Sequence, residues 1–498
     1  MNVAALSKRL PGSTRALATR AAASDRERVV ILGSGWAGYS LARNLDPAKY
    51  ERVVISPRSH FVFTPLLAGA AAGTLELGAT TEPVRRLGLD HFHQGWADKI
   101  DLRNKTITVE SNIGDERALA PEAVSSPTAA IALRTQAGVK GRLFDVPYDK
   151  LVVAVGAYSQ TFGVKGVRHN AHFLRDVGDA RAIRMRLLRC FERAALPTTT
   201  DQMRRDLLHF AVVGGGPTGI EFSAELHDLI HEDMVHLYPE LIPLIRITVY
   251  DVAPKVLPMF DAALSGFAMN LFKRQNIEIK TQHHILGIRR DNEAGEDGEG
   301  VLKLNIKEFG DQEVGAGLVV WSTGLTQNPV VKKLQDGEYV VPDVLREAAK
   351  VKVMRHPRSG SIIVDDTLRV KVQDTGSDAN APMNDVFAIG DCASVEGAMY
   401  PATAQVASQQ AAYLAKQLNK DSGLVRAPPF KFRNLGVMAY VGSWNAMYQA
   451  NKDGLKGRAA WLLWRMAYVT KSMSWRNRLM VPFSWMSTWL FGRDITRY

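Results

Sequence analysis

Short apolar runs rich in β-branched residues recur along the chain, and most of them end at a glycine-rich turn. We predict buried strands at 28–34, 52–56 and 151–155, and a helix over 37–45 between the first two. Strands that alternate with helices are typical of parallel sheets. The first third of the chain therefore predicts a doubly wound α/β unit.

The same pattern returns from about residue 210. A strand begins there, a helix follows and extends over 231–241, and further strands are predicted at 247–250 and 317–323. A last strand at 385–389 returns the chain to the first unit. The pattern thus predicts two Rossmann-type dinucleotide-binding domains.

Three other segments interrupt this alternation. The uncharged run 59–75 contains Pro65 and two glycines, which predicts a buried loop and helix start rather than a membrane span. Residues 111–142 are polar and without clear periodicity, which indicates a surface insertion. The acidic turn 291–300 lacks the spacing of a calcium loop, so we predict a solvated hairpin tip.

Two glycine-rich fingerprints, about 180 residues apart, follow the first strand of each unit. The first is VVILGSGWAG, with Gly33, Gly35 and Gly38, and the second is FAVVGGGPTGIEFSAEL, with Gly214, Gly216 and Gly219. In such motifs the glycines permit a tight turn, close approach of a pyrophosphate, and close packing of helix on strand. Two of them in strand–turn–helix context imply two bound dinucleotides, for which a flavin plus a nicotinamide is the usual reason.

Composition narrows the class of protein. With 498 residues, 46% hydrophobic and 23% charged, the chain is expected to fold into two or three globular domains. Cys190 and Cys392 are its two cysteines, which excludes a disulfide framework and a CxxC redox or zinc site. We predict no metal site.

The net charge of +11 is concentrated at the two ends of the chain. Residues 1–24 are rich in Arg, Ala and Ser and contain no acid, which is typical of a mitochondrial transit peptide. Residues 425–498 carry twelve Lys and Arg against two Asp, and six of the nine tryptophans lie after residue 440. The middle of the chain is slightly acidic.

Tryptophan and basic residues together favour the headgroup zone of a membrane. The longest uncharged stretch, 479–492, has 14 residues and contains Pro482, so it is too short to span a bilayer. We therefore predict a segment that lies on the membrane. Two alternatives remain at this point: a nucleic-acid-binding patch and a dimer interface.

These motifs, together with SPRSHFVFTPLL, VVAVGA, VVWSTG, VFAIGDCA, PATAQVASQQ and LFGRDITR, make the chain resemble a known family. It is similar to the type II NADH:quinone oxidoreductases, the rotenone-insensitive alternative NADH dehydrogenases of mitochondria, in a fungal-like form. The resemblance covers nearly everything from about residue 28 to the end. It implies a glutathione-reductase-like flavoprotein with a C-terminal membrane-anchoring segment.

The resemblance implies that the first fingerprint holds FAD. Ser56, Pro57 and Arg58 stand where many flavoproteins have a ribose-binding acid, so hydroxyl and backbone groups are expected to contact the ribose there. Asp391 is expected to bond the ribityl chain, although a strand-end carboxylate capping the next helix is the alternative. The other implied FAD residues are Thr64, Pro65, Ala154, Gly156, Gly390, Ala404 and Gln405.

The second fingerprint is expected to hold NADH, with Glu221 and Gly324 close by. Asp251 ends the second strand of this unit and can accept hydrogen bonds from the ribose hydroxyls. A carboxylate there repels a 2′-phosphate, which favours NADH over NADPH. The spacing from Gly214 to Asp251 is longer than usual, because of the helical insertion.

Four residues are implied to take part in catalysis. Glu221 is expected to face the nicotinamide–flavin contact and to move charge or protons, or simply to favour the helix dipole. Gln405 and Gln409 share one helix face, and their amides suit the oxygens of a quinone. The resemblance also places Tyr468 near the flavin and the quinone.

The predicted organisation is a transit peptide (1–24), an FAD domain in two parts (25–199 and 329–424), an NADH domain (200–328) and a membrane-anchoring domain (425–498). The predicted activity passes a hydride from NADH to FAD and two electrons to ubiquinone, without proton pumping. The predicted protein is a peripheral homodimer of the mitochondrial inner membrane, on the matrix side, that binds no nucleic acid. The alternative is a flavoprotein similar to apoptosis-inducing factor, whose basic C-terminus binds a partner or nucleic acid.

Overall fold

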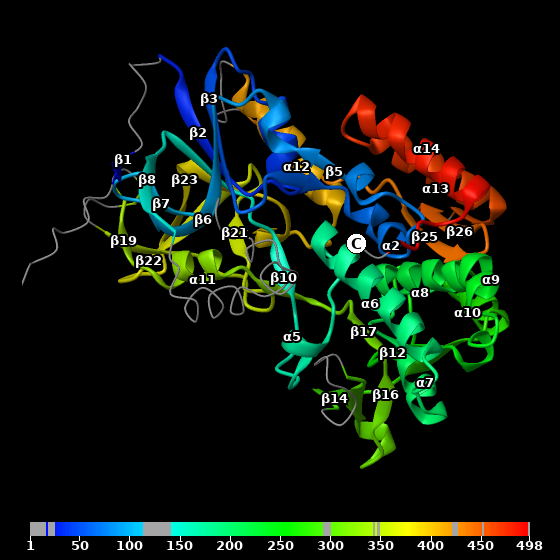
Figure 1. The fold of residues 1–498 in the computed structure, drawn as a ribbon. Helices are drawn as coiled ribbons and strands as arrows, with labels where there is room; N and C mark the ends of the chain where they lie inside the picture. The colour runs from blue at the N-terminus through cyan, green and yellow to red at the C-terminus, as the bar shows by residue number, and fades with distance from the viewer. Residues whose placement is uncertain are drawn as a thin grey trace, which may run out of the picture.

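The computed structural model describes residues 25–112, 141–291, 300–341, 344–345, 349–420, 427–450 and 453–496, and the backbone of 16–17. Figure 1 shows a lobe with a large sheet, a second α/β lobe beside it, and a C-terminal helix pair packed against both. The predicted transit peptide and most of the predicted insertion at 111–142 lie outside the described residues. So does most of the predicted hairpin tip, although the strands on either side of it pair antiparallel as a hairpin requires.

The first lobe is built on a sheet of 13 strands, with the order β1-β8-β7-β6-β3-β2-β9-β23-β22-β20-β19, and with β21 and β24 beside β22. The strands β6, β3, β2, β9 and β23 are parallel, and β2, β3 and β9 are buried almost throughout. Because parallel strands are buried on both faces, their sequences are continuous apolar runs, and these runs predicted the strands. The bounds are β1 (Ala16–Leu17), β2 (Glu27–Leu32), β3 (Tyr50–Ser56), β6 (His91–Asp101), β7 (Thr106–Ser111), β8 (Leu143–Pro147), β9 (Lys150–Val153), β19 (Tyr339–Val340), β20 (Lys350–Val353), β21 (Ile362–Val364), β22 (Arg369–Asp374), β23 (Asn380–Ala388) and β24 (Ala393–Val395).

Short helices cover this sheet and form the predicted buried loop of residues 59–75. Helix α1 packs on α12 beside the first glycine-rich turn. The small strands β4 and β5 pair with each other next to α2. The bounds are α1 (Trp36–Asn44), β4 (His60–Val62), η1 (Thr64–Leu66), α2 (Leu67–Ala71), η2 (Leu77–Thr80), β5 (Thr81–Pro83), η3 (Val84–Leu87), α11 (Pro329–Asp336), η8 (Gly390–Cys392) and α12 (Ala404–Leu418).

The second lobe contains a parallel sheet of order β13-β12-β11-β17 and an antiparallel sheet of order β14-β15-β16. The helix after β11 continues from α8 through one π-helical turn, η5, to α9, and ends at Leu237. The predicted extension to residue 241 was therefore too long; residues 242–244 form a separate 3-10 turn. The bounds are α5 (Val167–Asn170), α6 (Val177–Ala195), α7 (Asp201–Leu207), β11 (His209–Val213), α8 (Pro217–Leu229), η5 (Ile230–Met234), α9 (Val235–Leu237), η6 (Ile242–Leu244), β12 (Arg246–Asp251), α10 (Ala262–Arg274), β13 (Ile277–Thr281), β14 (Ile285–Arg290), β15 (Leu302–Ile306), η7 (Lys307–Phe309), β16 (Val314–Ala316) and β17 (Leu318–Trp321).

Two antiparallel strands connect the lobes. The chain leaves the first lobe through β10 (Ala157–Ser159) and returns through β18 (Leu325–Gln327), and these two strands pair with each other. Strand β23 then pairs with β9, so the chain returns to the first sheet as predicted. The paired crossing brings the carboxyl ends of both parallel sheets to the same region.

The C-terminal region contains a three-stranded antiparallel sheet that the sequence analysis did not predict. Its elements are β25 (Val437–Gly442), β26 (Asn445–Ala450), β27 (Asp453–Gly457), α13 (Arg458–Lys471) and α14 (Trp475–Phe491). Strand β25 packs on α8, and α13 packs on β26. Pro482 lies inside α14. Among the described residues, no helix combines the length and the apolar character that crossing a bilayer requires.

Candidate functional site

The two glycine-rich turns have the same local geometry. Gly33 and Gly214, the first glycines, have φ angles of +105° and +115°, a region that favours glycine. A Cβ on the third glycine, Gly38 or Gly219, would lie 2.0 Å from the carbonyl oxygen of the first. Each helix therefore approaches its turn this closely only because the third position has no side chain.

The second glycine of each turn faces open space. A Cβ on Gly35 or Gly216 would meet no heavy atom within 4 Å. These glycines are the N-caps of α1 and α8, and no side chain caps either helix. Both helix ends therefore present free N–H groups and a partial positive charge, which suits a pyrophosphate.

A cavity of about 680 Å³ is lined by both lobes and by the C-terminal region. The sequence-predicted residues that line it are Gly33, Gly35, Ser56, Pro57, Arg58, Thr64, Pro65, Ala154, Gly156, Glu221, Gly324, Gly390, Asp391, Ala404 and Tyr468. The predicted residues outside its lining are Gly38, Gly214, Gly216, Gly219, Asp251, Gln405 and Gln409.

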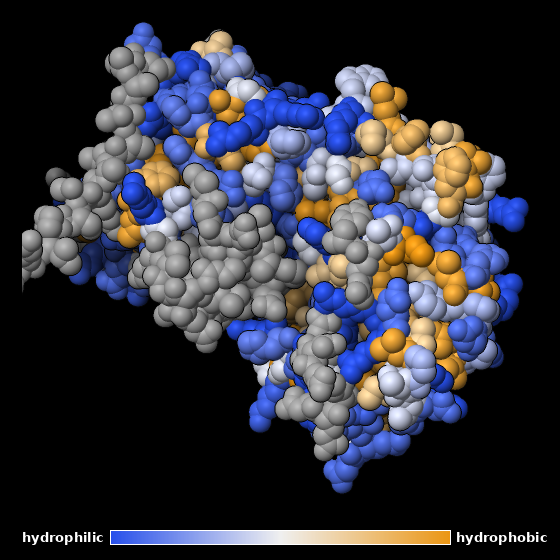
Figure 2. All heavy atoms as spheres, in the orientation of Figure 1, coloured by the Kyte–Doolittle hydropathy of each residue, from blue (hydrophilic) through white to orange (hydrophobic). Residues whose placement is uncertain are grey.

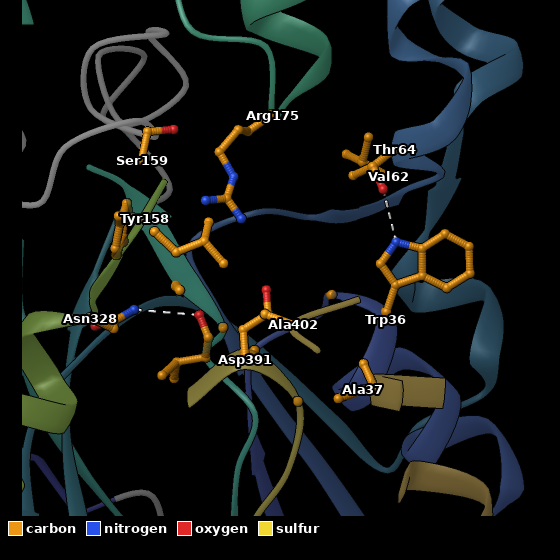
Figure 3. Close-up of a pocket in the computed structure, with 18 of the residues that line it drawn as sticks. Trp36, Ala37, Val62, Thr64, Tyr158, Ser159, Arg175, Asn328, Asp391 and Ala402 are labelled. Atoms are coloured by element: carbon orange, nitrogen blue, oxygen red, sulfur yellow. Dashed lines mark hydrogen bonds between the residues drawn. The ribbon is translucent and has the colours of Figure 1, made fainter. Parts of the chain in front are cut away.

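Asp391 and Arg175 point into this cavity from opposite sides (Figure 3). Burial raises the pKa of Asp391 and lowers that of Arg175, and each charge partly offsets the shift of the other. Arg175 Nη1 is buried without a hydrogen-bond partner in the described part of the chain. Since an unpaired buried donor is costly, this atom marks a place where a ligand acceptor would fit.

The end of β3 places hydroxyl and cationic groups beside the first turn. The hydroxyl oxygens of Ser56 and Ser34 lie 2.8 Å apart, and Arg58 donates to the Asp176 carboxylate over 2.5 Å. Although burial alone would raise it, Arg58 and a histidine hold the pKa of Asp176 below its ordinary value. Ser56 thus ends β3 at the position where many flavoproteins have an acid, and its hydroxyl contacts Ser34 of the first turn.

Trp36 and Thr64 line another part of the cavity wall. The Trp36 indole N–H donates to Thr64 Oγ1 over 3.0 Å (Figure 3). This hydrogen bond joins the first turn of α1 to the start of η1, and it fixes the position of Thr64 and Pro65 at the cavity.

Asp251 ends β12, and its carboxylate accepts hydrogen bonds from two backbone amides. One donor is Gly215 N, inside the second glycine-rich turn, and the other is Ala253 N, at 2.7 Å. Asp251 therefore fixes this turn and lies beside it, although it does not line the cavity.

Glu221 lies in the first turns of α8, and its side chain is buried at the cavity wall. Its Oε1 accepts a hydrogen bond from the backbone N–H of Tyr440 over 3.0 Å. Burial raises its pKa to about 8, with a smaller raising contribution from Glu225, while the Tyr440 N–H lowers it. A carboxyl that changes protonation near neutral pH can take up or release a proton at this wall.

Gln405 and Gln409 lie on one face of α12, as predicted, but both amides bond to the backbone of residues 433–436. Gln405 donates to the Gly436 carbonyl over 2.7 Å and accepts from Leu435 N over 3.2 Å. Gln409 donates to the Arg433 carbonyl and accepts from its N–H, both over 2.9 Å. Their direct contact with a quinone or flavin stays a prediction.

Tyr468, on α13, brings the C-terminal region to the cavity. Its ring packs edge-on against Phe63 of the first lobe, with centroids 5.9 Å apart. Burial, and the charge of Glu221, raise its pKa well above the ordinary value. The hydroxyl therefore stays protonated and can donate.

The donor set fits FAD. The turn at Gly35 is open for a pyrophosphate, Ser34 and Ser56 offer hydroxyls for a ribose, and Arg175 has an unused N–H. Trp36, Val62 and Tyr158 give the same cavity aromatic and apolar walls.

A family model described as pyridine nucleotide-disulphide oxidoreductase matches residues 27–411, and a second, described as the NDH2 C-terminal domain, matches residues 434–494. The internal alternative NAD(P)H-ubiquinone oxidoreductase A1 of Solanum tuberosum mitochondria is 34% identical, over 95% of this chain and 88% of the relative. The chain belongs to the type II NADH–ubiquinone oxidoreductases.

Other comparisons agree with this membership. A protein of Dictyostelium discoideum, described as a probable NADH dehydrogenase, is 37% identical over 95% of this chain and 92% of the relative. The fold is shared with the structure of NDH2 from Plasmodium falciparum in complex with NADH, which superimposes with a TM-score of 0.77 at 24% identity, covering 95% of this chain and 100% of that one. The family resemblance and the fold class predicted from the sequence are confirmed.

Three residues at the site were missed by the sequence analysis. Arg175 faces Asp391 from a distant part of the chain, and Tyr440 holds Glu221 through its backbone N–H. Gln410, which is 2% exposed, accepts from Gly390 N over 2.7 Å and so fixes the turn that carries Asp391. Of these three, only Gln410 could have been found from the sequence, because it directly follows the predicted Gln409.

Proposed function

We propose that this type II oxidoreductase carries a hydride from NADH to FAD and two electrons on to ubiquinone at a membrane surface, without pumping protons. One observation carries the proposal: the helices that follow the two glycine-rich turns, α1 and α8, line one cavity, which Tyr468 of the C-terminal region also lines. FAD, when bound, supplies the two-electron chemistry. The chain's own residues bind the two dinucleotides, orient them toward each other and shield them from water.

Each binding role rests on a contact. Gly33, Gly35 and the N-terminus of α1 suit the FAD pyrophosphate, while Arg175 and Asp391 offer a donor and an acceptor inside the cavity. The pyrophosphate of NADH would fit Gly214, Gly216 and the N-terminus of α8. Glu221 lies at the start of α8, where a proton on its carboxyl would face the reacting rings.

We further propose that Asp251 selects NADH. Its carboxylate is anchored to the turn through Gly215, so it cannot easily turn away from a 2′-phosphate. Several relatives are named NAD(P)H-ubiquinone oxidoreductases, so the preference has to be measured for this chain.

Membrane binding is proposed from the surface of α13 and α14. Eleven of the twenty-two exposed large apolar side chains of the described residues lie after residue 440. Five of them, Trp475, Leu479, Phe483, Met486 and Leu490, are spaced by three or four residues along one face of α14. Figure 2 shows apolar side chains gathered over the upper right of the molecule, where α13 and α14 lie in Figure 1.

The charges around this stripe match a membrane better than nucleic acid. Arg458 and Lys471, at the two ends of α13, and Arg476 on α14 are exposed. Arg493 is 8% exposed and pairs with two acids, and Arg465 lies 4.2 Å over the Trp461 ring. Two of the basic residues that suggested a nucleic-acid patch are therefore used inside the protein.

Relatives named mitochondrial support a mitochondrial location. Both internal and external forms match, at 34% and 31% identity, so identity does not favour one face of the inner membrane. We keep the matrix side, the homodimer and the predicted domain limits as proposals. The mass of the detergent-solubilised protein tests the homodimer, and protease protection in intact mitochondria tests the side.

The function is tested by turnover of the purified protein with its flavin content measured. We expect ubiquinone reduction with NADH that scales with flavin content, and kcat/KM for NADPH more than about tenfold lower, which corresponds to about 1.4 kcal/mol. Replacing Asp251 with Ser should narrow that preference. Flavin-loaded protein that oxidises NADH but leaves ubiquinone unreduced would contradict the proposal.

A further inference from the structure

A second cavity, of about 320 Å³, lies beside the first. One wall carries four acids of α8 and η5, and the other is built by tryptophans and two arginines of the C-terminal region. The lining is Thr74, Glu225, Asp228, Glu232, Asp233, Tyr440, Trp444, Trp461, Trp464, Arg465, Trp485, Thr488, Trp489, Gly492 and Arg493.

Tyr440 connects the two cavities. Its backbone N–H donates to Glu221, which lines the first cavity, and its hydroxyl donates to Asp228 Oδ2, which lines the second, over 2.5 Å. Trp464 lines the second cavity and packs edge-on against Tyr468 of the first, with centroids 4.8 Å apart. Two aromatic residues therefore form the wall between the cavities.

The acids form one stripe along a single helix. Glu221 and Glu225 are one turn apart on α8, Asp228 follows, and Glu232 lies on the π-helical turn η5. Glu221, Glu225 and Asp228 are buried, at 8%, 6% and 3% exposed, whereas the Glu232 side chain at the end of the stripe is 46% exposed. The stripe thus runs from the first cavity, past the second, to solvent.

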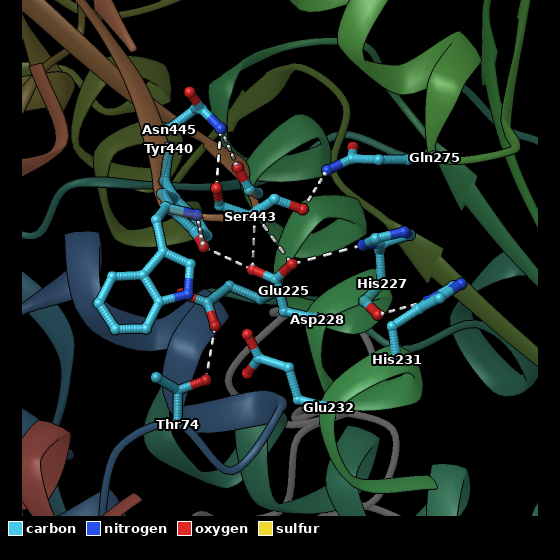
Figure 4. A network of polar contacts seen from close by, with 12 residues as sticks. Thr74, Glu225, His227, Asp228, His231, Glu232, Gln275, Tyr440, Ser443 and Asn445 are labelled. Carbon is cyan, nitrogen blue, oxygen red and sulfur yellow. Dashed lines mark hydrogen bonds and ion pairs between the residues drawn. The ribbon is translucent and has the colours of Figure 1, made fainter. Parts of the chain in front are cut away.

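Figure 4 shows how the middle of this stripe is held. The Thr74 hydroxyl donates to Glu225 Oε2 over 2.6 Å, and Arg493 Nε donates to Thr74 Oγ1 over 3.1 Å. The backbone of α2 packs on the other carboxylate oxygen, so that a Cβ on Gly69 would lie 3.2 Å from Glu225 Oε1. Glu225 is fixed at the second cavity, four residues after Glu221.

The reaction needs a proton from solvent. A hydride from NADH brings two electrons and one proton, whereas reduction of a quinone to a quinol takes two electrons and two protons. The balance is NADH + H⁺ + quinone → NAD⁺ + quinol. One proton per turnover must therefore reach the first cavity from outside it.

We propose that Glu225 takes this proton from the second cavity and passes it to Glu221, which delivers it to the first cavity. The proposal rests on the function proposed above. Glu225 is a positioning and relay residue, because it does not line the first cavity. Glu232, at the exposed end of the stripe, connects the second cavity to solvent.

The electrostatic surroundings support exchange near neutral pH. Burial raises the pKa of Glu225 to about 7, with Asp228 raising it further, while Arg493, Arg465 and the Thr74 hydrogen bond lower it. Glu221, with a pKa of about 8, is the next carboxyl inward. Both acids therefore gain and lose a proton at little cost in this range.

The charged and titratable groups that face Glu225 come from four elements, and they set its protonation. They are Glu221 and Asp228 on α8, Tyr440 on β25, Arg465 on α13, and Arg493 after α14.

The test uses the full-length, flavin-loaded Glu225→Gln variant, with anaerobic stopped-flow measurement of each half-reaction. We expect flavin reduction by NADH at the wild-type rate and reoxidation by ubiquinone slowed by about a hundredfold, the lower end of general acid–base contributions. The solvent deuterium isotope effect on reoxidation should rise. Added imidazole or formate should restore part of the rate.

A measurement without turnover tests the same group. Infrared difference spectra of the protein between acidic and alkaline pH should contain a carboxyl band that titrates near neutral pH. That band should be lost in Glu225→Gln and shifted in Glu225→Asp. Glu51→Gln removes a carboxyl that is equally buried but paired with Arg28 in the first sheet, and it should leave the band and both half-reactions unchanged.

The outcomes separate the two proposals. Wild-type protein that fails to reduce ubiquinone overturns the proposed function. If the wild-type protein is active but Glu225→Gln leaves the isotope effect and the pH profile unchanged, only the proton route is overturned. If Glu225→Gln does not fold, Glu225→Asp decides, because the pH profile of reoxidation must move with the acid at position 225. An unmoved profile contradicts the route.

Discussion

At the scale of single residues, the pair of Asp391 and Arg175 gives the most direct test of flavin binding. Replacing Asp391 with Ala removes an acceptor from the cavity and the acid whose charge acts most strongly on buried Arg175. We expect bound flavin to weaken by about 1.5–3 kcal/mol, typical of a hydrogen bond to a charged group. Flavin absorbance per protein measures it. Asp385→Ala, on the preceding strand β23 and paired with Lys105, is the control. Full flavin occupancy in Asp391→Ala would refute the assignment.

Glu221 should also leave a pH signature in stability. With a folded pKa of about 8 against an ordinary 4.5, the folded protein holds a proton there that the unfolded chain releases earlier. Stability is therefore lost as pH rises between these values. In Glu221→Gln we expect the melting temperature to fall less between about pH 5 and about pH 8 than in wild type. The exposed Glu240→Gln should behave as wild type, and an unchanged pH slope in Glu221→Gln would show that this acid is ionised at neutral pH.

At the scale of elements, α12 holds the irregular segment that leads into the C-terminal sheet. Gln405 and Gln409 fix residues 433–436, just before β25, whose Tyr440 holds Glu221. Gln405→Ala or Gln409→Ala should therefore slow reoxidation by ubiquinone more than reduction by NADH, as stopped-flow measures. Lys416→Ala, exposed on the same helix, should change neither step. Slowing of the reductive step alone would assign these amides to the nicotinamide side.

Helix α14 should provide part of the membrane affinity. Leu479 and Phe483 are 71% and 57% exposed on its apolar stripe. Burying each in lipid contributes about 1.5–3 kcal/mol, so Leu479→Ser with Phe483→Ser should lower liposome binding well over tenfold. Flotation measures it. Leu237→Ser with Leu286→Ser removes exposed apolar side chains elsewhere. Equal flotation of both double variants would show that the membrane contact is not on α14.

The sequence predicted the elements that have a local cause. Strands β2, β3 and β9 were found within two residues, since buried parallel strands need continuous apolar runs, and both glycine-rich turns lie where their motif requires. Strands β25 to β27 were missed, because they contain glycine and alternate with polar residues next to tryptophans that suggested a membrane. Arg175 was missed because its partner Asp391 is distant in the chain. Such contacts depend on the tertiary fold.

At the scale of the whole molecule, three parts of the chain enclose one cavity, and the C-terminus returns to the centre of the fold. Arg493 pairs with Glu232 and Asp233 of η5, and Asp494 pairs with Arg184 of α6. The apolar face of α14 is thereby joined to the helix whose other end carries Glu221 and the second glycine-rich turn. The proposed membrane contact is therefore connected to the cavity through these ion pairs.

The central claim is that this one cavity passes two electrons from NADH to ubiquinone. Anaerobic stopped-flow on one sample tests it most directly: one equivalent of NADH should bleach the flavin, and one equivalent of ubiquinone in liposomes should restore it, each fast enough to account for turnover. A flavin that NADH reduces but ubiquinone leaves bleached would contradict the account.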